Sequence, residues 1–136
     1  MSPEELATWE ELLQDPDRRA EAARALAQEH RPRGGERLAV ALEVLAIVTR
    51  APQEEARILA ELGRVRLSMS DGEQAALALA RAIYLAPDDA SLLKGLSQTA
   101  DRALAADVLQ DLASDAPPAA RAAIEAELAA LKLKLG

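Results

Sequence analysis

The sequence contains no cysteine and no phenylalanine, and its 136 residues include only one tryptophan, one tyrosine and one histidine. Without cysteine the chain has no disulfide framework, no thiol nucleophile and no thiolate metal site. With only two aromatic side chains of this size, its interior must be built from Ala, Leu, Ile and Val. Ala and Leu favour helices, and β-branched residues are too sparse and scattered to support strands, so we expect an all-α fold.

Positive charge is also scarce, because 16 basic residues face 23 acidic ones and give a formal net charge of −7. A protein that binds nucleic acid through its phosphates needs a positive surface, so we expect no nucleic-acid partner. The first residues lack the basic and apolar regions of a secretory signal, and no apolar run reaches the roughly 18 residues of a membrane span. We therefore expect a cytoplasmic protein.

Proline and glycine divide the chain into about seven to eight helices, which we group into a single domain over residues 1–136. The clearest interruptions are at Arg31–Gly35, Ala51-Pro52, Ser70–Gly72, Ala86-Pro87 and Pro117-Pro118. The expected segments are an N-terminal helix (1–16), a degenerate repeat (17–54), the best-defined repeat (55–89), another degenerate repeat (90–116) and a C-terminal capping helix (117–136).

Polar residues next to these interruptions predict where helices begin. Ser2 should cap the first helix, an Asp of Asp15-Pro16-Asp17 can cap the second, and either Thr99 or Asp101 should cap the seventh. In the last helix, one stripe should face the core, and Leu133 lies off that stripe. The residues of this stripe are Ile124, Leu128, Leu131 and Leu135.

Residues 56–89 carry a pattern of small and large side chains that fits two helices crossing closely. The first helix supplies Leu59, Leu62 and Gly63, Asp71-Gly72 makes the turn, the second helix supplies Ala75, Leu79 and Ala82, and Pro87 ends the unit. This stretch resembles a tetratricopeptide repeat, a helix pair of about 34 residues. Gly63, Ala75 and Ala82 would let the two backbones approach, while the leucines fill the flanks.

The resemblance is weaker on both sides of this unit. Residues 20–54 fit the pattern only if the first loop carries extra residues, and the helix after Asp89 is too short. Arg66 also stands where the family usually has an aromatic residue. The resemblance implies a right-handed α-solenoid of antiparallel helix pairs, with a related two-helix repeat or an irregular bundle as the alternatives.

No catalytic or metal-binding constellation is visible. His30 is the only histidine, and its place at a helix end favours a capping or surface role. The acidic pairs Glu54-Glu55 and Asp88-Asp89 begin helices, where they complement the helix dipole. Gly34-Gly35 lacks the lysine and hydroxyl of a phosphate loop. We assign no catalytic residue, no metal and no cofactor.

Basic side chains recur on the first helices of the expected pairs. In the family that the sequence resembles, these helices line a groove for a peptide or a partner helix. Arg can hold carboxylates with two parallel hydrogen bonds, so a basic strip would suit an acidic segment or a free chain terminus. The alternative is a set of solvated helix faces, partly paired with Glu61 or Glu21. The candidate residues are Arg24, Arg31, Arg57, Arg64, Lys94 and Gln98.

We therefore expect a non-catalytic protein-interaction module, a scaffold or adaptor whose partner is another protein or a peptide. Two alternatives stay open: a small secretion-type chaperone that holds an unfolded client, and a self-assembling subunit that uses Leu133 and the last helix to form a homo-oligomer. The chain is also compatible with a piece of a longer repeat array.

The close crossing gives a first prediction. Ala82→Leu should wedge the two helices apart and lower the melting temperature, because overpacking of this kind costs ~1–3 kcal/mol. Thermal unfolding followed by circular dichroism measures the change. An unchanged melting temperature would contradict the crossing.

Overall fold

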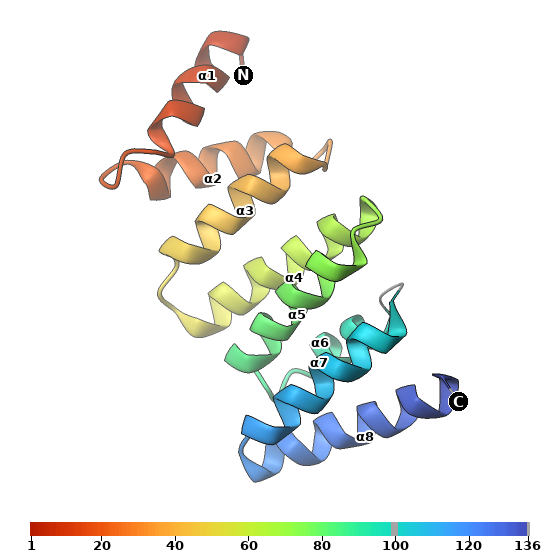
Figure 1. Cartoon of the computed structure of the whole chain (residues 1–136). Coiled ribbons are helices and arrows are strands. Elements are labelled where there is room, and N and C mark those ends of the chain that lie inside the picture. The colour runs from red at the N-terminus through yellow and green to blue at the C-terminus, as the bar shows by residue number, and fades with distance from the viewer. Residues whose placement is uncertain (99–100, 136) are drawn as a thin grey trace.

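The computed structural model describes residues 1–98 and 101–135, and this part of the chain forms eight α-helices and no strand (Figure 1). Each helix packs against the next, and α5 also contacts α7, as α6 contacts α8. The stack begins at α1 and ends at α8, and the all-α prediction is confirmed. The helices are α1 (Pro3–Leu12), α2 (Arg19–His30), α3 (Glu36–Val48), α4 (Pro52–Ser68), α5 (Gly72–Leu85), α6 (Ala90–Ser97), α7 (Arg102–Asp115) and α8 (Pro118–Leu135).

Short polar side chains begin several helices by accepting hydrogen bonds from free backbone amides. The Ser2 hydroxyl accepts from the Glu5 N–H at 3.2 Å, which confirms the predicted cap of α1. Asp101 caps α7, whereas the alternative Thr99 lies outside the described residues. The other capping bonds join Asp71 to the Gln74 N–H and Asp89 to the Ser91 N–H.

The expected cap of α2 is wrong. The residue before this helix is Arg18, and its side chain makes no capping bond. The Asp17 N–H instead donates to Asp15 Oδ1 at 3.0 Å, so the aspartates around Pro16 stabilise a turn two residues before the helix.

The core is built from alanine, leucine and isoleucine alone among the apolar residues that the structure describes as buried. Valine was also expected there, but each of the five valines is partly buried or exposed. Alanine and leucine make up most of the buried set, and the valines lie at its margin or outside it. The largest fully buried side chains are Leu42, Leu59, Leu62, Ile83, Leu96, Leu109, Ile124 and Leu131.

At the crossing of α4 and α5, Gly63 lies in close contact with its neighbours. A Cβ atom added to Gly63 would lie 2.9 Å from Leu79 Cγ and 3.4 Å from the Ala75 carbonyl oxygen. Ala75 and Ala82 are both completely buried. The prediction that small residues allow this close approach is therefore confirmed for Gly63 and Ala75.

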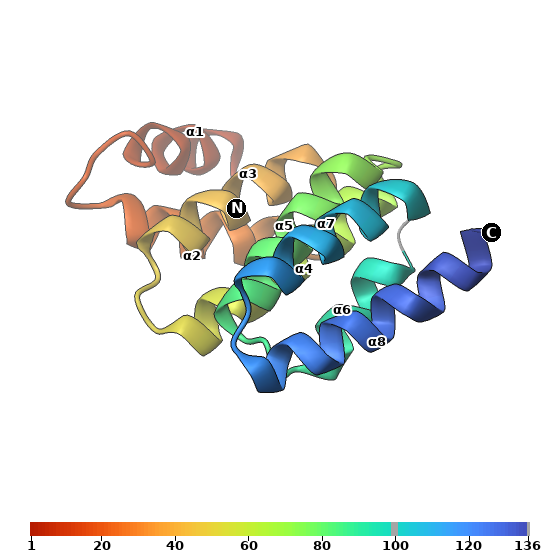
Figure 2. The same ribbon diagram turned by 60° about the horizontal axis from the view of Figure 1, so that its bottom comes forward.

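Helix α8 lies along the short α6 and extends beyond it (Figures 1 and 2). Ile124, Leu128 and Leu131 are buried as predicted, but Leu135 is 46 % exposed, so its predicted place in the core is wrong. Leu135 lies in the last turn, where it lines an open depression with Lys134 and the start of α7. Neither α8 nor any other helix in the described ranges is long and apolar enough to cross a membrane.

Gly63 and Gly95 provide a matched pair of substitutions. Gly63→Ala places a methyl group against the Leu79 branch, so we expect the free energy of unfolding to fall by about 1–2 kcal/mol. Gly95→Ala meets its nearest atom, Leu79 Cδ2, only at 3.7 Å. Its better helix propensity should raise the same quantity by up to about 1 kcal/mol. Urea unfolding of both variants measures the difference, and equal stabilities would contradict the tight crossing.

Candidate binding cleft

A cleft of about 780 Å³ lies between α4 and α6, and the end of α5 and the following turn contribute to its wall. Helix α6 packs on α5, α7 and α8. Lys94 and Gly95 of α6 line one wall of the cleft, and Arg57 and Arg64 of α4 line the other. Both helices are first members of the helix pairs expected from the sequence.

The floor of the cleft is apolar. Ala60 and Leu79 are each 6 % exposed, and both line it. Leu79 lies between two glycines, because it contacts Gly63 on α4 and is the nearest neighbour of a Cβ added to Gly95 on α6. Small residues on both walls thus keep the floor open and let one leucine of α5 form it.

The rim of the cleft is basic. Arg57 and Arg64 project from α4, and Lys94 and Gln98 project from α6, so the structure brings together four of the six candidate residues. All four are exposed, and among the described residues the three cations have no ion-pair partner. Three positive charges above an apolar floor favour an anionic ligand that also carries apolar groups.

Carboxylates are confined to one end of the cleft. Asp88 and Asp89 line it where the chain enters α6. Asp89 is occupied by local bonds, because its Oδ1 accepts from the Ser91 N–H at 3.0 Å and from the Ser91 hydroxyl at 2.6 Å. The acidic pair therefore begins a helix, as the sequence predicted.

The two candidate residues on α2 and after it lie outside this cleft. Arg24 is exposed on α2. Arg31 binds Glu61 of α4 through two hydrogen bonds of 2.9 and 3.2 Å, and the hydrogen bond to Glu61 raises the pKa of Arg31 above its usual value. Glu61 lies between Arg57 and Arg64 in the sequence, so this ion pair ties α2 to the cleft-bearing helix and leaves Arg31 already paired.

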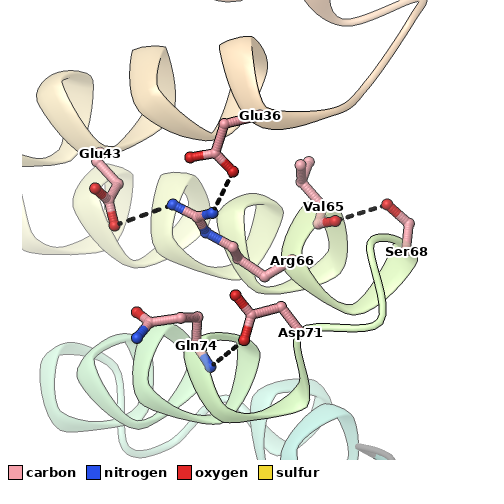
Figure 3. A network of polar contacts seen from close by, with 7 residues as sticks. All are labelled: Glu36, Glu43, Val65, Arg66, Ser68, Asp71 and Gln74. Carbon is pink, nitrogen blue, oxygen red and sulfur yellow. Dashed lines mark hydrogen bonds and ion pairs between the residues drawn. The ribbon is translucent and has the colours of Figure 1, made fainter.

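Arg66 points to the other side of α4, toward α3 (Figure 3). Its guanidinium binds Glu36 at 2.7 Å and lies 3.8 Å from Glu43, and its side chain is only 12 % exposed. The sequence pattern marks Arg66 as a departure from the repeat that it resembles, but does not indicate these partners. The position packs against α3 through a long stem and a charged end.

His30 is buried, with 4 % of its surface exposed, so its predicted surface role is wrong. It follows Leu26 and Ala27 by four and three residues, which places it on the same core-facing side of α2. Its Nε2 atom has no hydrogen-bond partner within the described part of the chain. In the same residues, no group of three or more His, Asp or Glu side chains is arranged to hold a metal ion.

Comparison of the chain with models of protein families, with curated proteins and with solved structures gives no match.

The partners of Arg66 suggest two substitutions that separate its stem from its charge. Arg66→Met keeps most of the buried stem and removes the ion pairs to half-exposed carboxylates, which should cost less than about 1 kcal/mol. Arg66→Ala also removes the packing of the stem, so its free energy of unfolding should be about 1–2 kcal/mol lower still. Chemical denaturation measures both variants. Equal losses would show that charge, and not packing, makes the contact.

Proposed function

We propose that the chain is a non-catalytic interaction module of the cytosol that binds an acidic peptide, or an acidic face of a partner helix, in the cleft between α4 and α6. The observation that carries this proposal is the grouping of Arg57, Arg64 and Lys94 over an apolar floor, with no carboxylate paired to any of them in the described residues. A scaffold or adaptor role follows from a surface that binds a chain segment without reacting with it.

A tetratricopeptide-like arrangement supports the same proposal. We assign α2 with α3, α4 with α5 and α6 with α7 as antiparallel helix pairs, stacked in the right-handed sense and closed by α8. The spacing of small residues in α4 and α5, and the close contact at Gly63, agree with this assignment. The first helices of the pairs, α4 and α6, then border the groove in which the family binds peptides.

Charge gives the proposed site its selectivity. The whole chain carries a formal net charge of −7, so most of its surface repels an acidic ligand. The basic rim is a local exception, and its two arginines can each hold a carboxylate through paired hydrogen bonds. An extended peptide with acidic residues on one side and an aliphatic residue on the other would satisfy both the rim and the Leu79 floor.

Charge reversal tests the proposal. We expect the double variant Arg57→Glu/Arg64→Glu to bind fluorescent Asp- and Glu-rich peptides at least about tenfold more weakly than the parent chain. The loss should be larger at low salt than at high salt, because exposed charges are screened. Fluorescence anisotropy at two salt concentrations measures both effects.

The control changes the same charge elsewhere. Arg37→Glu/Arg81→Glu alters two exposed arginines of α3 and α5 that do not line the cleft. It should retain binding apart from a small general effect of net charge. Equal binding by the cleft variant and the parent chain, or no binding of any acidic peptide by the parent chain, would reject the proposed site.

A further inference from the structure

Helix α8 has two apolar faces, and the described part of the chain covers only one of them. The covered face packs against α6 and α7 and contains Ala120, Ile124, Leu128 and Leu131, all of them buried. At 100° per residue, the opposite face consists of alanines and Leu133, and every residue on it is exposed. Leu133 is 85 % exposed, the highest value among the large apolar side chains that the structure describes as exposed.

The exposed face has the spacing of a helix-pairing seam. Its central residues recur at alternating intervals of three and four, as in a helix that packs lengthwise against another helix. No charged residue interrupts this seam. The central residues are Ala119, Ala122, Ala126, Ala129 and Leu133.

Two opposite charges border the seam on one edge. Glu125 and Lys132 are seven residues apart, so they lie on the same side of α8, and both are exposed. Neither makes an ion pair with any residue in the described ranges. Their order along the helix makes this edge complementary to a copy of itself that runs in the opposite direction.

We propose that α8 pairs in an antiparallel manner with α8 of a second copy of this chain, about a two-fold axis near the middle of the helix. In this arrangement Glu125 lies beside Lys132 of the second copy, and the symmetry makes the same contact twice. In a parallel pair, Glu125 would instead lie beside the uncharged Ala130 of the second copy. Charge complementarity therefore selects the antiparallel direction.

Side-chain size selects the same direction. An antiparallel pair places Leu133 over Ala122 of the second copy, so a large side chain meets a small one at each end. A parallel pair would bring two Leu133 side chains together at one end and leave only alanines at the other, which would splay the helices. The alanines between the ends allow the two backbones to approach closely along the whole seam.

The proposed contact is small. Helix α8 has 18 residues, which corresponds to a length of about 27 Å, and a single helix pair of this length buries less than a standard interface of roughly 800 Å² per partner. We therefore expect a weak dimer, monomeric at about 10 µM and mostly dimeric at about 1 mM. This association is independent of the ligand proposed for the α4–α6 cleft.

Charge exchange along the edge tests the pairing by sedimentation velocity over this concentration range. We expect Glu125→Lys and Lys132→Glu to weaken association about tenfold each, and the double exchange to restore it. Glu125→Lys also changes the net charge from −7 to −5 (−7 + 2), so general repulsion between copies falls. A purely non-specific association would therefore become stronger in this variant. Glu10→Lys, on the exposed side of α1, is the matched control and should not weaken association.

Introduced cysteines test the direction of the pair, since the chain has none of its own. A mixture of the Ala122→Cys and Leu133→Cys variants should form a disulfide between residues 122 and 133 of different copies on oxidation. Disulfides that join 122 to 122 and 133 to 133 would instead indicate a parallel pair and overturn the proposal. A parent chain that stays monomeric at about 1 mM, or a dimer that the charge changes leave unaffected, would also overturn it.

Discussion

The structure depends on one close contact, the approach of α4 to α5 where Gly63 meets Leu79. Because a Cβ added to Gly63 would lie 2.9 Å from Leu79 Cγ, no other residue fits there without displacing a core side chain. The same leucine also reaches the space beside Gly95, where it forms the floor of the cleft. The packing that holds the central helix pair together therefore also shapes the candidate binding surface.

Alanine replaces aromatic residues as the means of packing in this chain. Large rings would separate the helices, whereas alanines bring the backbones close and let single leucines fill the remaining space. Arg66 is a second example of packing without an aromatic ring. Its mostly buried stem and two glutamates of α3 make the contact between α4 and α3. At this point α3 and α4 are held together by the aliphatic stem of Arg66 and by its ion pairs with Glu36 and Glu43.

Local rules predicted the helices well, although the expected cap of α2 fails for a local reason, because the Asp17 N–H bonds to Asp15. Ser2, Asp71 and Asp89 cap helices by bonds within three residues, so the sequence pattern reveals them. The ion pair between Arg31 and Glu61 joins residues thirty positions apart, and no spacing rule links them. The helical period places His30 on the same side of α2 as Leu26 and Ala27, whereas its degree of burial depends on the helices that pack around it.

The positions of the candidate residues, and not their role, can be compared with the structure. Seven-residue spacing correctly placed Arg57 and Arg64 on one side of α4, because that relation is internal to the helix. Their proximity to Lys94 and Gln98 follows from the turn between α5 and α6. Leu135 is exposed although it belongs to the apolar stripe of α8. The stripe is an internal property of the helix, whereas burial also requires a neighbouring helix beside its last turn.

Two ion pairs with the same sequence separation join α4 to the helices before it. Arg31 to Glu61 and Glu36 to Arg66 each span thirty residues, and the two α4 partners lie on different sides of that helix. On the other side of the cleft, α6 packs against α5, α7 and α8. The cleft thus lies between a wall that ion pairs join to the preceding helices and a wall that no ion pair reaches in the described residues.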